Sequence, residues 1–482
     1  MQFLTNLKSK IALTKIAKPE LLLVICAFII YLLWAACLSI SQSPDEFMRF
    51  DISLFIQTYG SLPEGNDYLI RNPVWGVSYA YSPYGSTLLA VPFVFVASLF
   101  TSDVNIWLFA ARLVSVFCST GTVALCLLIG KRVFALPATR FLFACLVAFL
   151  PQFVFLSSYF NCDAFALFST ALIFYSWIRG FDTNWDRKSY LLLGLGIGLC
   201  LMSYYNAYGF VLASAILLLG NIVIQKTHSN KVRHRANYKS TLSKAALLAF
   251  PIIIIASWFF IRNFIIYDGD ILGMATSRNA SEMYALAEFK PSNRSTFGNQ
   301  GLTVFDMLIA HDFDWIKGTI KSFIGTFGYL SVHLPRTLYY SYYAVLLLVL
   351  LVVIYDLITT KKKELLFKLC CAVCIITPIC LSLYYSYASD YQAQGRYVMT
   401  MIIPLFFLAS FGVEKIIKRI TADKRANIFI YLISMIYFTL FCFVLFTTII
   451  PECYSVPFDI YPEEYYRDNS PFLASQPERI SE

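Results

Sequence analysis

Apolar runs of bilayer length recur along the chain and are separated by shorter polar segments. A membrane-crossing helix needs about 20 mostly apolar residues. By this measure the pattern predicts about eleven crossings in an all-α polytopic membrane protein. The expected crossings are 20–40, 104–130, 140–158, 162–179, 189–204, 207–225, 245–262, 338–359, 365–386, 395–413 and 426–450. We expect 1–450 to form one transmembrane domain and 451–482 to form a short tail.

The composition agrees with this class. Hydrophobic residues make up 58% of the chain and charged residues 14%, whereas a soluble domain typically carries about 25% charged residues. The first apolar run is longer than the core of a cleaved signal peptide, so we expect the first helix to be retained. No Walker-type loop, Rossmann glycine pattern or Cys/His cluster is present. Direct use of a nucleotide is therefore not expected.

The distribution of Lys and Arg predicts the orientation in the membrane. Basic residues favour cytoplasmic loops. Of the 38 Lys and Arg residues, 25 lie in six short segments: the N-terminus, 131–140, 179–188, 225–244, 361–368 and 415–425. These segments are expected inside the cell, in a cytoplasmic membrane, and the basic loops reflect topology and not nucleic-acid binding.

The same orientation places the two longest loops, 41–103 and 263–337, and the tail on the extracytoplasmic side. The apolar run 85–101 is expected to be interfacial or re-entrant, because a full crossing there would put 131–140 outside. Long outer loops make the outer face the expected place for a functional site.

Two adjacent carboxylates, Asp45 and Glu46, follow the first predicted crossing. A carboxylate at the membrane face can act as a general base for a hydroxyl nucleophile, and a second can orient the acceptor or hold a divalent cation such as Mg²⁺, Mn²⁺ or Ca²⁺. The alternative is structural, with Ser43, Asp45 and Glu46 opening an amphipathic helix that runs to Tyr59.

A third carboxylate, Asp163, lies in the predicted turn between two crossings, beside Asn161. A carboxylate at the end of a helix hairpin is costly unless it is paired or faces a cavity. Asp163 and Asn161 are therefore candidates to line the same site as Asp45. The alternative is a plain helix N-cap, a position that Asn and Asp both favour.

Two arginines are predicted at the outer ends of crossings. Arg396 follows Gln394 and Gly395, and Arg262 ends the crossing 245–262. The planar guanidinium suits bidentate binding of phosphate, and a lipid phosphate is the natural anion at this depth. Gly395 would allow the backbone to approach a ligand closely. An interfacial anchor is the alternative role for either arginine.

Aromatic residues of the first outer loop are candidates to stack on a sugar ring, namely Trp75, Tyr79 and Tyr81. Trp and Tyr are also typical of the membrane interface, which is the alternative for each of them.

These motifs together resemble the GT-C superfamily, the multi-spanning glycosyltransferases that use polyprenyl-phosphate sugars. Pro44-Asp45-Glu46 resembles their acidic motif in the first outer loop, and 81–100 with 105–134 resembles the segments that follow it in protein-mannosyltransferase-like members. The segment PQFVFLSSYFNCDAFALF (151–168) is similar to the one that carries a second acidic residue, here Asp163. SFIGTFGYLSVHLP (322–335) and QAQGRYVMTMIIPL (392–405) resemble an uncharacterised bacterial branch.

The resemblance implies a GT-C-like bundle with juxtamembrane helices in the first outer loop. It places Asp45 at the reaction centre, with Glu46 or Asp163 beside it, and Arg396 near the lipid phosphate. The substrate-binding candidates are Arg396, Arg262, Tyr79, Tyr81 and Gln394. The expected partners are the lipid bilayer, a polyprenyl-phosphate sugar donor, and a cell-envelope glycan, lipid or protein as acceptor.

The function expected from this reading is inverting transfer of a sugar to an acceptor hydroxyl. Three alternatives stay open: a lipid-linked glycan flippase or transporter, a polysaccharide polymerase or ligase, and a noncatalytic accessory protein. A transporter should place charges within its crossings, where Arg112 is nearly the only one.

Overall fold

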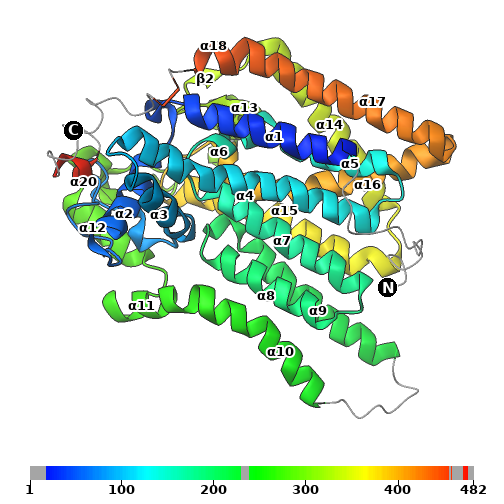
Figure 1. Ribbon diagram of the computed structural model, residues 1–482, viewed down its shortest axis with the longest axis horizontal. Helices are drawn as coiled ribbons and strands as arrows, with labels where there is room; N and C mark the ends of the chain where they lie inside the picture. The colour runs from blue at the N-terminus through cyan, green and yellow to red at the C-terminus, as the bar shows by residue number, and fades with distance from the viewer. Residues whose placement is uncertain (1–17, 229–237, 455–456, 459–469, 476–482) are drawn as a thin grey trace.

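The computed structural model describes residues 18–228, 238–454, 457–458 and 470–475 (Figure 1). The described part is an elongated helical bundle with one two-stranded hairpin. The helices are α1 (Lys18–Cys37), α2 (Glu46–Tyr59), α3 (Gly85–Ser98), α4 (Val104–Val133), α5 (Pro137–Ala148), α6 (Pro151–Ser158), α7 (Asp163–Asp182), α8 (Arg187–Leu201), α9 (Gly209–His228), α10 (Tyr238–Ile252), α11 (Trp258–Ile266), α12 (Met274–Tyr284), α13 (Val304–Gly325), α14 (Arg336–Ile358), α15 (Leu365–Ala388), α16 (Ile402–Ile420), α17 (Asp423–Val444), α18 (Ile450–Glu452) and α20 (Pro471–Ala474).

Shorter elements join these helices. They are the 3₁₀ helices η1 (Ile40–Gln42), η2 (Tyr79–Tyr81), η3 (Tyr205–Ala207), η5 (Ala287–Phe289), η6 (Pro291–Asn293), η7 (Lys362–Glu364) and η8 (Gly395–Met401), the π-helical turns η4 (Ile253–Ser257) and η9 (Leu445–Ile449), and the strands β1 (Thr326–Phe327) and β2 (Val332–His333). β1 and β2 are antiparallel, with Thr326 opposite His333.

Nine helices of the described chain are long and apolar enough to cross a membrane, and the pair α5 and α6, bent by 61°, would make a tenth. This confirms the polytopic all-α class, and nine or ten crossings among the described residues are close to the eleven predicted. The predicted crossing 189–204 forms α8, which has 15 residues and is therefore about 22 Å long. That is shorter than the hydrocarbon core of about 30 Å. The run 85–101 forms α3, a 14-residue apolar helix too short to cross.

The core is centred on α4, which packs against α1, α3, α5 and α7 (Figure 1). Small residues let neighbouring helices approach closely, as is typical in membranes. A Cβ on Gly194 of α8 would lie 2.2 Å from the Leu248 carbonyl oxygen of α10, and one on Gly196 would lie 2.9 Å from Ile173 of α7. Glycine at these positions therefore allows α8 to fit between its two neighbours.

Both long outer loops are folded. The first contains α2 and α3, and α2 is largely buried against α3 instead of lying on the surface. The second contains α12, α13 and the β1–β2 hairpin, so most of it is ordered secondary structure. In Figure 1, α2, α3, α12 and α20 gather at one end of the bundle.

Part of the predicted tail packs on this end. Ser470 donates a hydrogen bond to the Asp51 carboxylate of α2 at 2.5 Å, and Phe472 packs against Phe55 at 6.4 Å between ring centres. Most of the tail, the first N-terminal lysines and 229–237 lie outside the described residues.

Candidate functional site

The central feature of the site is an ion pair between Asp45 and Arg396. Asp45 Oδ2 accepts a hydrogen bond from Arg396 Nη2 at 2.9 Å, and the two side chains are 27% and 15% exposed. Asp45 occupies the N-cap position of α2 but makes no capping hydrogen bond, and its φ is +63°. A non-glycine residue in this left-handed region costs about 1–3 kcal/mol and is typical of functional sites. The Asp45 side chain therefore does not cap α2, which was the structural alternative for this residue.

Arg396 is fixed by the start of η8. The Gly395 amide donates a hydrogen bond to the Ser322 hydroxyl of α13 at 2.5 Å, and a Cβ on Gly395 would lie 2.0 Å from the Phe323 nitrogen. Glycine is therefore required here by close packing on α13 and not by approach of a ligand. The Arg396 guanidinium also lies 5.1 Å from the centre of the Tyr397 ring. Its buried Nε has no hydrogen-bond partner within the described residues.

Asp163 joins this pair as the first residue of α7 and is 8% exposed. The capping role belongs to Asn161, whose side-chain oxygen accepts from the Ala164 amide at 2.9 Å. Asp163 interacts electrostatically with Arg396 and Arg49, which favour its charged form, and with Asp45, which opposes it. The structure thus places Asp163 within electrostatic range of Asp45. The Asn161 amide nitrogen instead donates to the backbone carbonyls of Leu156 and Tyr159.

Arg49 was not among the predicted site residues. It follows Asp45 by one turn of α2, is 9% exposed and lies 4.3 Å over the Tyr79 ring. Burial opposes its charge, but Cys162, Tyr79, Asp45 and Asp163 together keep the pKa of Arg49 above its ordinary value. Burial and the Asp45 charge raise the pKa of Tyr79 well above its ordinary value, so Tyr79 remains a neutral hydroxyl. The i to i+4 spacing of Asp45 and Arg49 is the sequence signal that could have identified Arg49.

We call Asp45, Arg49, Asp163 and Arg396 the charge cluster. Its two carboxylates balance two guanidinium groups in a largely buried site, which limits the cost of burying charge.

Glu46 lies outside the charge cluster. Its carboxylate accepts from Arg112 Nε at 2.8 Å and from Arg112 Nη2 at 2.6 Å, and both side chains are fully buried. Arg112 also donates to the carbonyl oxygens of Ala35 and Leu38 at the end of α1, and the Phe160 amide donates to Glu46. This pair joins α1, α2, α4 and the turn before α7, so the described contacts of Glu46 are structural.

Arg262 and Tyr81, both predicted to bind substrate, brace the first outer loop. Arg262 Nη2 donates to the carbonyl oxygens of Leu62 and Pro63 at 3.3 and 2.9 Å. Tyr81 is 2% exposed and packs against Tyr267 with 5.1 Å between ring centres. Trp75 packs against Phe289 with 4.7 Å between ring centres. None of these described contacts joins the charge cluster.

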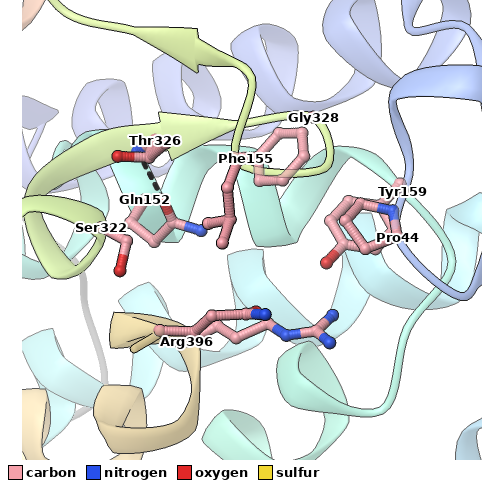
Figure 2. Close-up of a pocket in the computed structure, with 10 residues that line it drawn as sticks. Pro44, Gln152, Phe155, Tyr159, Ser322, Thr326, Gly328 and Arg396 are labelled. Atoms are coloured by element: carbon pink, nitrogen blue, oxygen red, sulfur yellow. Dashed lines mark hydrogen bonds between the residues drawn. The ribbon is translucent and has the colours of Figure 1, made fainter. Parts of the chain in front are cut away.

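A small pocket of about 10 Å³, which is room for about one water molecule, opens beside Arg396 (Figure 2). Its lining comes from α6, α13, η8, the hairpin and the segment before α2. The lining residues are Pro44, Gln152, Phe155, Tyr159, Ser322, Thr326, Gly328, Leu330, Gln394 and Arg396. Gln394 was predicted to bind substrate, whereas Gln152 and Tyr159 were not, because they lie in an apolar run that resembles an ordinary crossing.

A divalent cation was a further expectation. Within the described residues, no three His, Cys, Asp or Glu side chains come close enough to hold a metal ion. Asp45 is also paired with Arg396. This donor set does not form a cation site of three protein ligands, and we assign no step to a metal.

The comparisons with solved structures show the GT-C-like fold. The apo oligosaccharyltransferase of Archaeoglobus fulgidus is 12% identical with a TM-score of 0.51, over 87% of this chain and 54% of that one. The same archaeal enzyme with an inhibitory peptide and dolichol-phosphate has 11% identity and a TM-score of 0.49, over 88% and 55%. ArnT from Cupriavidus metallidurans has 11% identity and a TM-score of 0.37, over 83% and 78%. This chain therefore spans about half the length of the archaeal enzyme.

No curated protein matches the sequence. A family model described as a predicted membrane protein (DUF2142) matches residues 71–405. This match covers more than half of the chain. The chain belongs to the DUF2142 family of multi-pass membrane proteins.

Proposed function

We propose that the protein is a GT-C-type glycosyltransferase that moves a sugar from a polyprenyl-phosphate donor to a hydroxyl group of an extracytoplasmic acceptor. The observation that carries the proposal is the Asp45–Arg396 ion pair, with Asp163 beside it, at one end of a GT-C-like bundle. A base and a cation held together suit a reaction in which an acceptor loses a proton while a phosphate departs. The acceptor is a cell-envelope glycan, lipid or protein.

The proposed reaction is a single inverting displacement. The acceptor oxygen forms a bond to the anomeric carbon of the sugar, and the bond from that carbon to the phosphate oxygen breaks. The electron pair goes to the departing polyprenyl phosphate, and the acceptor proton goes to the Asp45 carboxylate. Arg396 stabilises the charge that grows on the phosphate, the kind of interaction that often contributes most to catalysis.

The Asp45–Arg396 ion pair would set the order of two events, with donor binding first and removal of the acceptor proton second. Asp45 shares the Arg396 guanidinium at 2.9 Å in the ligand-free protein. A donor phosphate competes for the same guanidinium, because Arg binds phosphate and carboxylate in the same bidentate manner. Donor binding would therefore loosen Asp45 from Arg396 and free its oxygen for the acceptor. Asp163 and Arg49 then keep the cluster neutral while Asp45 moves.

The orientation is also a proposal. The described basic residues at the ends of α4 and α16, including Lys131 and Arg419, are typical of a cytoplasmic face. Asp45, Asp163 and Arg396 lie near the opposite ends of α1, α7 and α16. We therefore place the charge cluster outside a cytoplasmic membrane with the N-terminus inside, with 1–450 as one transmembrane domain and 451–482 as an outer tail.

A charged residue within a crossing would favour the transporter alternative, and Arg112 is such a residue. Its environment in the structure nevertheless weakens that alternative. Its guanidinium is fully buried against Glu46 and two backbone carbonyls of α1. It is therefore part of the scaffold and does not line a passage in the described structure.

The full chain in proteoliposomes tests the proposal. A radiolabelled polyprenyl-phosphate sugar pool is supplied with a crude envelope fraction, and empty liposomes serve as the control. We expect label to enter the envelope fraction and free polyprenyl phosphate to appear in equal amount, with the anomeric configuration of the sugar inverted. Absence of lipid-linked sugar consumption, with each candidate acceptor supplied, would refute the proposal. Movement of intact lipid-linked sugar across the bilayer would favour the transporter instead.

A further inference from the structure

We propose that four tyrosines beside the charge cluster bind the acceptor, and that this acceptor is an uncharged glycan. The inference rests on the proposed function and adds the class of acceptor. The four residues are Tyr79, Tyr204, Tyr385 and Tyr397, and we call them the tyrosine array. Three observations carry the inference: the array meets the charge cluster, its side chains are partly exposed, and the charges around it are balanced.

Tyr397 is the centre of the array. Its hydroxyl accepts a hydrogen bond from Arg396 Nη2 at 3.3 Å. Its ring centre lies 6.4 Å from that of Tyr204 and 6.1 Å from that of Tyr385. The three rings are therefore contiguous and begin at the proposed phosphate-binding arginine.

Tyr79 joins the array from the side of Asp45. The Arg49 guanidinium lies 4.3 Å from the centre of the Tyr79 ring, and Tyr79 is within electrostatic range of both Asp45 and Tyr397. Tyr397 and Tyr385 are also within electrostatic range of Asp45. The array therefore adjoins the carboxylate that is proposed to take the acceptor proton.

Four distant segments contribute these side chains. Tyr79 begins η2, Tyr204 precedes η3, Tyr385 lies in the last turn of α15, and Tyr397 lies in η8. Tyr385 is 42% exposed and the other three are partly exposed. Among the described residues, no hydrogen bond given by the structure uses the hydroxyls of Tyr79, Tyr204 or Tyr385. These hydroxyls are therefore available to a ligand.

A sugar suits such a surface better than a lipid chain does. A pyranose has an apolar C–H face and a rim of hydroxyl groups. A tyrosine offers an apolar ring face and a hydroxyl that both donates and accepts hydrogen bonds. A hydrocarbon chain would instead cover the charge cluster without replacing the hydrogen bonds that its groups make to water, which is costly.

The surrounding charges favour an uncharged sugar. The charge cluster pairs two carboxylates with two guanidinium groups. At the more exposed end of the array, Tyr385 lies within electrostatic range of Asp390 and Arg294, again one acid and one base. Neither end has an excess of positive charge to attract a polyanion, and the donor phosphate would add a negative charge beside it. An uncharged glycan meets no such repulsion.

The chemical linkage of the product tests the inference. Transfer from the radiolabelled polyprenyl-phosphate sugar to an envelope fraction of the source cells is carried out in proteoliposomes. The product is then digested with proteinase K, extracted with chloroform and methanol, and partly hydrolysed with acid. We expect the label to resist the first two treatments and to be released by acid as an uncharged disaccharide. Label on a peptide, on an extractable lipid or on a charged sugar would overturn the inference.

Variants of the array locate the acceptor. Tyr204→Phe should raise the acceptor KM by about 3- to 10-fold, the worth of one hydrogen bond. Tyr385→Ala should raise it further than Tyr385→Phe, because alanine removes the ring as well as the hydroxyl. The kcat at saturating acceptor and the Kd for polyprenyl phosphate should remain those of wild type.

Tyr384→Ala and Tyr340→Phe are the matched controls. Both tyrosines are strongly exposed, at 67% and 68%, and are typical of the membrane interface. Neither change should alter the acceptor KM. An unchanged acceptor KM in the array variants, an equal rise in the controls, or a parallel loss of donor binding would contradict an acceptor site.

The two proposals fail in different ways. If transfer proceeds but the label enters peptide or lipid, or the array variants leave the acceptor KM unchanged, the glycan site is overturned and the transferase stands. Purified uncharged envelope polysaccharide can also be tested for binding to the full chain in nanodiscs. If it binds, and binds less well to the array variants, but is never glycosylated, the array is supported and the transferase is overturned.

Discussion

Replacing Glu46 by glutamine distinguishes the role of Glu46 from that of the adjacent Asp45, because glutamine keeps the shape of glutamate and removes its charge. Glu46 accepts two hydrogen bonds from Arg112 and one from the Phe160 amide, and both members of the ion pair are fully buried. The glutamine side chain would keep one acceptor oxygen, but its amide group would face the Arg112 donors.

The expected loss follows from these contacts. One charge-assisted hydrogen bond contributes about 1.5–3 kcal/mol, and removing one partner of a buried ion pair costs about 3–5 kcal/mol in total. Arg112 would still bond the carbonyls of Ala35 and Leu38, which are at the negative end of α1. We therefore expect a decrease in the free energy of unfolding of about 3 kcal/mol, at the lower end of this range.

Unfolding in mixed micelles of dodecylmaltoside and SDS measures this loss. Asp423→Asn is the control, because Asp423 pairs with Lys418 at 3.4 Å and its side chain is 68% exposed, so loss of this pair should cost at most about 1 kcal/mol. Combining Glu46→Gln with Arg112→Met should recover part of the stability, giving a coupling of about 1 kcal/mol or more in the double-mutant cycle. Wild-type stability in Glu46→Gln together with lost transfer would refute the reasoning, because Glu46 would then act in chemistry.

Three further outcomes are expected. Arg396→Lys should lower kcat by about 10²-fold or more and weaken donor binding, measured as kcat and as Kd for polyprenyl phosphate, because lysine lacks the planar fork; unchanged kinetics would contradict the phosphate role. Asp163→Asn should lower kcat and tighten donor binding, since it leaves the charge cluster with an excess positive charge that attracts the donor phosphate; unchanged kcat and unchanged donor Kd would contradict this role. Asp51→Asn should raise thermal stability at pH 7–8. Burial raises the pKa of Asp51 well above its ordinary value, so the folded wild type loses stability as pH rises through that pKa, and Asn does not. The difference should shrink toward pH 4; a difference that persists there would contradict this explanation.

The class of fold could be predicted from the sequence, because long apolar runs are a strong signal of membrane-crossing helices. Apolar runs predict the crossings, and charged residues that lie within the membrane are candidates for a functional site. Asp45, Asp163 and Arg396 were chosen as site candidates, and the structure pairs Asp45 with Arg396 and places Asp163 within electrostatic range of both. The extra crossing at 189–204 was predicted because hydropathy does not reveal that α8 ends after 15 residues.

The sequence could not predict which arginine pairs with each of the two adjacent carboxylates. Asp45 and Glu46 are adjacent and chemically alike, yet a left-handed residue at Asp45 turns one toward Arg396 while the other meets Arg112. Both ion pairs join residues far apart in the chain, so no local pattern encodes them.

The most direct measurement is the turnover of lipid-linked sugar by Asp45→Asn in proteoliposomes. The matched control is Asp103→Asn, an isosteric change at the N-cap of α4, where Asn retains the capping ability. The account predicts that Asp45→Asn lowers kcat by about 10²–10⁴-fold, the usual contribution of a general base. Its donor Kd should be tighter than that of wild type, because Asn competes less well with the phosphate for Arg396. Its folding, and kcat for Asp103→Asn, should remain within about twofold of wild type. Wild-type turnover in Asp45→Asn would contradict the central claim, because the acceptor proton would then have another destination.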